Sequence, residues 1–401
     1  MARAVFYNVP ASGHINPSLP VVAELVAAGE EVVYYASAGY RRAVEATGAS
    51  FRAYPGLPDD YFPAFGLDGT SPPRTAAVLA ETAGRLVPWL VDEAAAVRPD
   101  YVLVDSMCCW GWLVAQALRL PTVVSSTFLT LTLPVVLREP AFAGVLTSLV
   151  RGLPHLPGFY RAWRPLAARF GVRPLRLDQL FAIPGDLTIS YTSPVFQPGA
   201  GGSAGRTVFV GPSVGARVDQ PEFPFGWLDG RPLVYASLGT VNYDNPAFFH
   251  TCIEAFSGGA YQLVLSVSKG DPRRLGRIPD HVLVRPAVPQ LDLLARAALL
   301  VTHGGMNSVQ EALLHEVPTI AVPHQPEQAC VARQLARLGA GAMLPARRLS
   351  PQRLRNLATR MLHDGHLRRR VRQVAGSLRE AGGAPRAAAE ILAWSRRPAH
   401  S

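Results

Sequence analysis

The sequence has 401 residues, of which 49% are hydrophobic and 17% are charged; this composition is typical of globular domains and excludes a disordered chain. The formal net charge is +10, but aromatic residues do not interleave with the basic ones, which argues against nucleic-acid binding. No apolar run reaches the ~18–20 residues that span a bilayer, and the four cysteines lack metal-ligand spacing. We therefore expect a cytoplasmic protein with reduced thiols and no transmembrane segment.

The first half of the chain alternates between apolar strand-like runs and helix-like periodicity. Strands are predicted at 5–9, 32–35, 51–54, 101–105, 122–125 and 207–210, and helices at 17–28, 39–47, 75–97 and 108–118. Alternation of this kind predicts a parallel sheet with helices on both faces. Residues 211–228 are rich in proline and glycine without periodicity, so we interpret them as a linker.

The alternation restarts after the linker and continues to the end of the chain. Strands are predicted at 233–237, 262–266, 281–285, 297–301, 319–322 and 341–344, and helices at 246–256, 291–295, 328–338, 351–363, 366–381 and 385–396. A length of 401 residues accommodates two domains of ordinary size. The sequence therefore predicts two doubly wound α/β units in tandem.

The segment GHINP, residues 13–17, follows the first predicted strand. Asn16 is a good N-cap and Pro17 a good first helical residue, so His14 is expected in the loop just beyond the strand. Asp105 ends the apolar run YVLVD of the fourth strand. Strands one and four of a doubly wound sheet are commonly neighbours, and ligands bind outside their carboxyl ends. A carboxylate next to His14 would hold the tautomer of the imidazole. Alternatively, Asp105 caps the next helix and His14 is an ordinary loop histidine.

The stretch LLVTHGGMNSVQEALL, residues 299–314, combines a buried strand, a glycine turn and a helix. The turn at His303, Gly304 and Gly305 presents backbone N–H groups and the positive end of the helix dipole, an arrangement that binds phosphate. Glu311 lies one turn further, where a carboxylate can accept hydrogen bonds from ribose hydroxyls. Each feature also has a structural explanation: a turn made for backbone geometry, a core histidine and a solvated helix carboxylate.

Three other polar segments follow strands of the same predicted sheet. Residues 237–240 (SLGT) end its first strand, and Ser237 and Thr240 can add hydroxyls and N–H groups to a phosphate site. In the loop at 288–290, Gln290 can read the edge of a base while Val288 lies against its face. Glu327 and Gln328 follow the strand at 319–322 and offer acceptors and donors to sugar hydroxyls. Their common position at one edge of the sheet predicts a nucleotide site.

These motifs (GHINP, SLGT, VPQ, THGGMNSVQEAL and PEQ) resemble those of the nucleotide-sugar-dependent glycosyltransferases of family 1, in particular the bacterial macrolide and natural-product enzymes. The resemblance implies the α/β GT-B fold, with two tandem Rossmann-like doubly wound domains and an interdomain cleft. The acceptor-binding domain would cover 1–210, the linker 211–228 and the donor-binding domain 229–381. A C-terminal helix within 382–401 would pack back on the first domain.

The resemblance also implies a reaction. A sugar would pass with inversion from a UDP- or dTDP-sugar co-substrate to a hydroxyl of a small hydrophobic acceptor, such as a macrolide, polyketide or flavonoid-like compound. No metal or other cofactor would be required, and the protein would be a monomer or homodimer. His14 would be the general base, supported by Asp105. In the donor, the base would contact Val288 and Gln290, and the ribose would contact Glu311. The phosphates would be bound by His303, Gly304, Gly305, Asn307 and Ser308. The sugar would be held by Glu327 and Gln328, and Ser237, Gly239 and Thr240 would lie near the phosphates or the sugar.

Apolar side chains of the first domain are expected to line the acceptor site, with core packing as the alternative for each: Phe62, Phe65, Met107, Trp110, Trp112 and Phe128. Other functions stay open at this stage. C-glycosylation of an aromatic acceptor or epimerisation of a UDP-sugar would use the same fold, and a non-catalytic helper would bind a nucleotide-sugar without turnover. The pair of His14 and Asp105 favours O-transfer over epimerisation, and release of UDP or dTDP distinguishes an enzyme from a helper.

Overall fold

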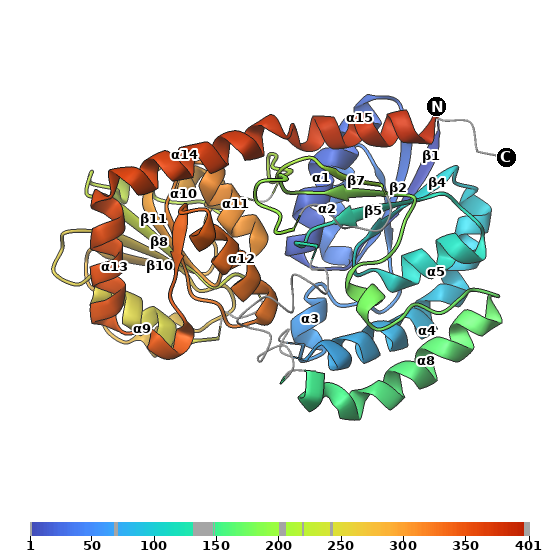
Figure 1. The fold of residues 1–401 in the computed structure, drawn as a ribbon, viewed down its shortest axis with the longest axis horizontal. Coiled ribbons are helices and arrows are strands. Elements are labelled where there is room, and N and C mark those ends of the chain that lie inside the picture. Colours follow the sequence, from blue (N-terminus) through green and yellow to red (C-terminus); the bar gives the residue numbers. More distant parts are fainter. Residues whose placement is uncertain are drawn as a thin grey trace. The chain divides into compact units, whose positions relative to one another are not determined.

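The computed structural model describes residues 2–67, 71–130, 147, 149–199, 206–218, 220–240 and 244–396. The chain divides into two compact units, one made of Met1–Val218 with Ala381–Ser401 and the other of Asp219–Glu380 (Figure 1). Each unit contains its own parallel sheet with helices packed on it. This is the two-domain α/β architecture that the sequence predicts, whereas the cleft between the domains stays a prediction.

The sheet of the first unit has seven parallel strands in the order β3-β2-β1-β4-β5-β6-β7. Their bounds are β1 Arg3–Tyr7, β2 Glu31–Ala36, β3 Ser50–Ala53, β4 Tyr101–Asp105, β5 Thr122–Ser126, β6 Leu187–Ser190 and β7 Arg206–Phe209. The pairing of β1 with β4 confirms that the first and fourth strands are neighbours. Strand β6 is missing from the prediction.

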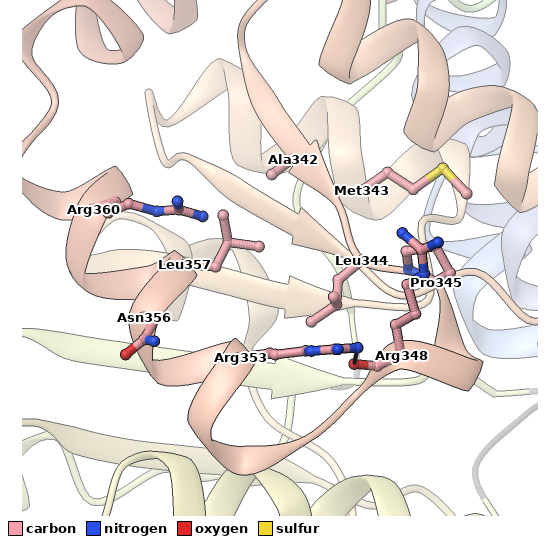
Figure 2. Close-up of a pocket in the computed structure, with 9 residues that line it drawn as sticks. All are labelled: Ala342, Met343, Leu344, Pro345, Arg348, Arg353, Asn356, Leu357 and Arg360. Carbon is pink, nitrogen blue, oxygen red and sulfur yellow. Dashed lines mark hydrogen bonds between the residues drawn. The ribbon is translucent and has the colours of Figure 1, made fainter.

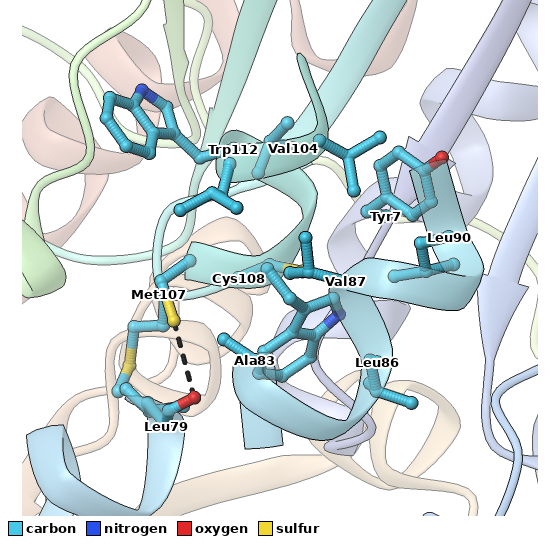
Figure 3. Packing of buried hydrophobic residues seen from close by; sticks show 14 of the residues in the cluster. Tyr7, Leu79, Ala83, Leu86, Val87, Leu90, Val104, Met107, Cys108 and Trp112 are labelled. Carbon is cyan, nitrogen blue, oxygen red and sulfur yellow. Dashed lines mark hydrogen bonds between the residues drawn. The ribbon is translucent and has the colours of Figure 1, made fainter. Parts of the chain in front are cut away.

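The helices of the first unit pack on both faces of this sheet. They are α1 Ser12–Ala27, α2 Arg41–Glu45, α3 Tyr61–Ala64, α4 Pro72–Val97, α5 Cys109–Ala117, α8 Leu156–Arg169 and α15 Gly383–Ser395. On one face, Leu79, Ala83 and Leu90 of α4 pack with Tyr7 of β1 and Val104 of β4 (Figure 3). On the other face α15 packs against α1, so the last described helix belongs to the first unit.

Helix α1 begins earlier than predicted. Its N-cap is Ala11, and Pro17 and Pro20 lie inside the helix instead of at its start. The prediction that Asn16 caps the helix is therefore wrong. Proline is favoured at a helix start but is not confined to it, and Pro17 and Pro20, which lie beyond the first turn, each leave one i→i−4 hydrogen bond unformed. As a consequence, His14 lies within the first helical turn and not in a loop.

The second unit contains a six-stranded parallel sheet in the order β10-β9-β8-β11-β12-β13. Its strands are β8 Leu233–Ser237, β9 Gln262–Ser266, β10 Val282–Arg285, β11 Ala297–Thr302, β12 Thr319–Ala321 and β13 Gly341–Met343, all at predicted positions. Its helices are α9 Pro246–Ala255, α10 Gln290–Leu294, α11 Met306–Leu314, α12 Pro326–Arg337, α13 Pro351–His363 and α14 Gly365–Glu380. Strands β8 and β11 pair at the centre of the sheet, where the strand order reverses. None of the helices in the described part of the chain is long and apolar enough to cross a membrane.

Candidate active site

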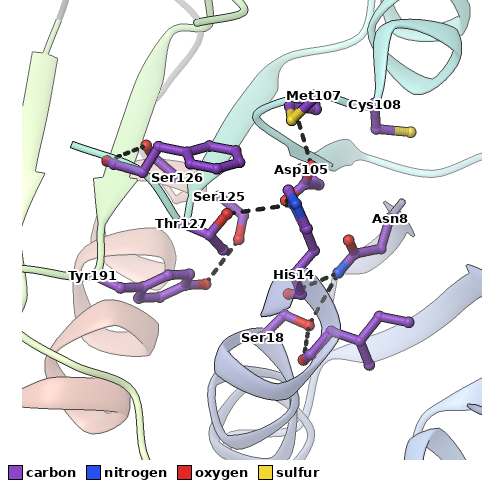
Figure 4. A network of polar contacts seen from close by, with 12 residues as sticks. Asn8, His14, Ser18, Asp105, Met107, Cys108, Ser125, Ser126, Thr127 and Tyr191 are labelled. Atoms are coloured by element: carbon purple, nitrogen blue, oxygen red, sulfur yellow. Dashed lines mark hydrogen bonds and ion pairs between the residues drawn. The ribbon is translucent and has the colours of Figure 1, made fainter. Parts of the chain in front are cut away.

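A histidine and a carboxylate meet at the carboxyl edge of the first sheet. Nδ1 of His14, in the first turn of α1, lies 2.9 Å from Oδ2 of Asp105 at the end of β4 (Figure 4). Asp105 is completely buried and His14 is 6% exposed. Buried charged groups are rarely left without a partner, and here each side chain supplies one for the other. The structure thus brings together two residues that the sequence places 91 positions apart.

The carboxylate of Asp105 is held on both oxygens. Oδ1 accepts a hydrogen bond of 2.9 Å from the backbone N–H of Met107, while Oδ2 faces the imidazole. A carboxylate only accepts, so the proton between the two groups lies on Nδ1, and the tautomer that this contact selects has its lone pair on Nε2. The N-cap of helix α5 is Cys108, so Asp105 does not cap this helix, although its Oδ1 holds the turn that precedes it.

Polar residues that the sequence interpretation missed surround this pair. The hydroxyl of Thr127 lies 3.3 Å from Nδ1 of His14. Nδ2 of Asn8 donates to the backbone carbonyl of His14 at 3.3 Å (Figure 4). It also donates to the hydroxyl of Tyr34 at 2.6 Å. Because these residues lie on three different strands or strand ends, no local sequence pattern marks them. They fix both the ring and the backbone of His14.

Two of the predicted acceptor residues lie beside His14. The ring centroid of Phe128 is 5.1 Å from that of His14, and the centroid of Phe62 is 5.8 Å away. Both phenylalanines are half-buried. Phe65, also half-buried, instead packs on Tyr61 at 4.9 Å. The surroundings of the histidine are therefore aromatic on two sides.

The other predicted acceptor residues are core residues. Trp110 is completely buried and packs edge-on against Tyr54, as the core-packing alternative expects, and a role in lining the acceptor site stays a prediction. Trp112 and Met107 are each 5% exposed, and the indole N–H of Trp112 donates to the carbonyl of Pro184 (Figure 3 shows the surrounding packing). A helix that follows a buried strand presents large apolar residues mainly to the sheet, which composition alone does not separate from a ligand pocket.

In the second unit, His303 follows β11 and is enclosed by two glycines. A Cβ atom at Gly305 would lie 2.6 Å from Nε2 of His303, and one at Gly239 would lie 2.8 Å from its Cε1. Gly239 also has a φ of +69°, and its N–H donates to the Ser237 hydroxyl at 3.2 Å. The two turns predicted to face each other, 237–240 and 302–305, therefore meet around one imidazole.

The pKa of His303 is lowered to about 4, mainly by burial and also by the nearby His324, while a hydrogen bond with the Ser237 backbone acts in the opposite direction. His303 is consequently neutral at pH 7 and offers hydrogen bonding but no charge. His324, in the loop after β12, was absent from the prediction. Burial also lowers its pKa, and its buried Nε2 makes no hydrogen bond within the described structure. Its position just after β12, at the same sheet edge as His303, is the sequence signal that could have identified it.

Helix α11 begins directly after this turn. Gly305 is its N-cap and provides no side chain to cap the first N–H groups, and Gly304 has a φ of +89°. Asn307 and Ser308, in the first turn, are half-buried, and Thr240 is exposed at the turn after β8. The predicted phosphate contacts thus lie on one turn and one helix start of the second unit, which is an anion-binding geometry.

The predicted base and ribose contacts form a hydrogen-bonded pair. Nε2 of Gln290 donates to Oε2 of Glu311 at 2.6 Å, and Oε1 of Gln290 accepts from the hydroxyl of Tyr235 at 3.0 Å. Glu311 is 6% exposed, so it is not a solvated helix carboxylate. Val288 is 9% exposed and packs in the cluster that contains Tyr235 and Ala312. Most of its side chain is therefore core, and only a small edge is left for a base.

Glu327 and Gln328 lie in the first turn of α12, which begins two residues before the predicted start at 328. Oε1 of Gln328 accepts from the backbone N–H groups of His324 at 3.0 Å and Gln325 at 3.2 Å, which forms half of a capping box. Gln328 is buried, whereas Glu327 is half-buried. The side-chain oxygen of Gln328 thus stabilises the helix start, and a role in holding the sugar stays a prediction for both residues.

A separate hollow of about 550 Å³ lies between β13 and α13 (Figure 2). None of the predicted site residues contributes to it. Its lining is Ala342, Met343, Leu344, Pro345, Arg348, Arg353, Asn356, Leu357 and Arg360. The three arginines are exposed, so the hollow is an open basic surface distinct from both predicted sites.

Comparison with known proteins relates the whole chain to glycosyltransferases. A family model described as "Erythromycin biosynthesis protein CIII-like, C-terminal domain" matches residues 259–392. The chain is 32% identical over 395 residues to the "Uncharacterized UDP-glucosyltransferase YojK" of Bacillus subtilis (strain 168), covering 98% of this chain and 97% of the relative. It is 30% identical over 413 residues to the demethyllactenocin mycarosyltransferase of Streptomyces fradiae, covering 100% of this chain and 87% of that protein.

Among solved structures, the glycotransferase of kitacinnamycin superposes with a TM-score of 0.80 at 28% identity, and the match covers 98% of both chains. The likeness therefore extends over both units and is not confined to the C-terminal motifs.

Proposed function

Because this chain belongs to the family 1 nucleotide-sugar-dependent glycosyltransferases and has their GT-B fold, we propose that it transfers a sugar from a UDP- or dTDP-sugar to a hydroxyl of a small apolar natural product. One similar protein is named as a UDP-glucosyltransferase and another as a mycarosyltransferase, which supports a nucleotide-sugar donor and a macrolide-type acceptor. The half-buried rings of Phe62 and Phe128 beside His14 support an apolar or aromatic acceptor.

The observation that carries the proposal is the buried pair of His14 and Asp105, 2.9 Å apart. Nε2 of His14 takes the proton of the acceptor hydroxyl while Asp105 stabilises the imidazolium that forms. The acceptor oxygen bonds to the anomeric carbon as the bond from that carbon to the diphosphate oxygen breaks. Attack from the face opposite the leaving group inverts the anomeric configuration.

The leaving diphosphate is stabilised by groups of the second unit. The uncapped N–H groups at the start of α11 and the positive end of its dipole face the anion. His303 is neutral at pH 7, so it adds a hydrogen bond and no charge. We assign binding of the ribose to Glu311 and of the transferred sugar to Glu327 and Gln328. The proposal uses no metal ion for charge stabilisation, and a chelator is expected to leave the rate unchanged.

The test is a transfer assay with UDP- and dTDP-sugars and a panel of macrolide and phenolic acceptors. Release of the nucleoside diphosphate measures turnover, and NMR of the product gives the anomeric configuration and whether the new bond is to oxygen or carbon. His14→Ala is expected to lower kcat by ~10²–10⁴ while nucleotide affinity is kept. Replacement of the exposed His155 by alanine is the matched control. Full turnover by His14→Ala would exclude the proposed base, and a retained configuration would exclude direct displacement.

A further inference from the structure

Three side chains from three elements of the second unit form a continuous hydrogen-bonded chain. Tyr235 lies in the middle of β8, Gln290 is the first residue of α10 and Glu311 lies on α11. The Tyr235 hydroxyl lies 3.0 Å from Oε1 of Gln290, and Nε2 of Gln290 lies 2.6 Å from Oε2 of Glu311. The same elements share one apolar cluster, in which Tyr235 packs with Leu293 and Ala312.

The carboxylate of Glu311 determines which group donates in each of these two hydrogen bonds. Glu311 as a carboxylate only accepts, so the NH₂ group of Gln290 must face it. The carbonyl oxygen of Gln290 then faces Tyr235, and the phenol must donate. An amide turned by 180° would place its oxygen against the carboxylate and its NH₂ group against the phenol. The attraction between the NH₂ group and the carboxylate would then be replaced by a repulsion between the amide oxygen and the carboxylate.

Tyr235 is well placed to enforce this orientation. It is 1% exposed, and its ring is fixed by the strand and the surrounding cluster, so its hydroxyl has a single location. Gln290 is half-buried and carries a long side chain with several rotamers. A fixed donor at one end of a flexible amide selects one of those rotamers before any ligand binds.

We propose that Tyr235 is a positioning residue of the donor site: through Gln290 it holds the Glu311 carboxylate in the orientation that accepts the ribose hydroxyls of the nucleotide. Tyr235 itself does not touch the ligand, and Gln290 serves as the link between the tyrosine and the carboxylate. The inference rests on the proposed function, in which Glu311 binds the ribose.

The first experiment measures the Kd of UDP and dTDP by calorimetry for Tyr235→Phe, Gln290→Ala and the double variant. Phenylalanine keeps the ring in the cluster and removes only the hydroxyl. Tyr235→Phe is expected to raise Kd by about 3- to 10-fold, the factor for one hydrogen bond, with kcat at saturating donor changed less than about twofold. In the Gln290→Ala background the same change is expected to have no further effect, because Tyr235 acts through Gln290.

Tyr261→Phe removes a phenol of the same unit whose ring packs on Phe256, and it is expected to bind nucleotide as the wild type does. An unchanged Kd in Tyr235→Phe, or an equal loss in both backgrounds, overturns the proposal. A change that only lowers the midpoint of unfolding and leaves Kd intact shows a structural role and also overturns it.

A second experiment needs no nucleotide and keeps this proposal separable from the proposed function. NMR of the Gln290 side-chain amide in the ligand-free protein is expected to show slow proton exchange in the wild type and at least about tenfold faster exchange in Tyr235→Phe. Equal exchange in the two proteins overturns the positioning role. If exchange differs as expected but no variant, including the wild type, binds UDP or dTDP, the proposed function fails instead.

Discussion

Nδ1 of His14 lies 2.9 Å from Oδ2 of Asp105, and the second oxygen of the same carboxylate accepts from the backbone N–H of Met107. Because β1 and β4 pair in parallel, α1, which follows β1, starts at the edge where β4 ends. The hydrogen bond from the Met107 N–H fixes the orientation of the carboxylate, so that Oδ2 faces the imidazole. This relationship makes the tautomer of His14 depend on the carboxylate of Asp105.

Asp105→Asn is expected to reduce kcat by about 10²–10⁴ without weakening nucleotide binding. The asparagine oxygen retains the hydrogen bond from Met107, which turns its NH₂ group toward His14. Nδ1 must then accept, so Nε2 carries the proton and no longer serves as a base. Steady-state kinetics and calorimetry measure the two effects.

The matched control is Asp100→Asn, an exposed carboxylate just before β4 that accepts from the backbone N–H of Arg3. It is expected to keep the wild-type rate. A wild-type rate for Asp105→Asn would show that the carboxylate does not set the tautomer.

Gly305→Ala is expected to displace the His303 ring and weaken nucleotide binding. The backbone of Gly305, at φ −61° and ψ 139°, suits alanine, so the cost comes only from a Cβ 2.6 Å from the imidazole. Overpacking of this kind costs about 1–3 kcal/mol. Gly226→Ala, where a Cβ meets nothing within 4 Å, is the control in the same unit. Urea unfolding and nucleotide titration measure both effects; if Gly305→Ala matches Gly226→Ala in both, the close packing is not rigid.

The buried His303 is expected to make stability depend on pH. Its pKa is lowered from 6.5 to about 4, so the unfolded chain takes up the proton more readily than the folded one. The contribution is therefore complete above pH 6.5 and is lost as the pH falls toward 4. Between pH 7 and pH 5 the loss amounts to about 2 kcal/mol.

Urea unfolding of wild type and His303→Gln at both pH values isolates this contribution as the difference between their pH dependences. The exposed His250→Gln is the control and is expected to follow the wild type. Parallel pH profiles for wild type and His303→Gln would contradict a neutral buried histidine.

Two substitutions of Gln328 distinguish the role of its side-chain oxygen in capping α12 from the proposed role of its amide N–H groups in binding the sugar. Gln328→Glu keeps an acceptor for the N–H groups of His324 and Gln325 and adds a negative charge at a helix start, so stability is expected to be retained. Gln328→Ala loses the cap and about 0.5–2 kcal/mol. If the amide also donates to the sugar, both variants raise the KM of the donor. A raised KM in Gln328→Ala alone would indicate that only the helix start matters.

Local patterns predicted much of the fold. The six strands of the second unit and the three last helices appear where alternation and periodicity place them, because these patterns reflect which face of each element is buried. Local signals failed where a competing rule was stronger. Asn16 and Pro17 carry the sequence signal of a helix start, yet they lie inside α1.

The sequence by itself determined the α/β architecture and the polar segments that follow the strands, since strands, helices and turns obey local rules. It predicted that His14 meets Asp105, with a helix cap and a loop histidine as the alternative, and the pairing of β1 with β4 brought the two together. Only the tertiary structure decided which side chains face one another there. It buried Trp110, turned Gln328 into a helix cap, enclosed His303 between two glycines and linked Tyr235 through Gln290 to Glu311. The reason is physical: strand and helix identity follows from near neighbours in the chain, whereas the side chains that meet depend on strand order, on where each helix begins and on how side chains share the interior.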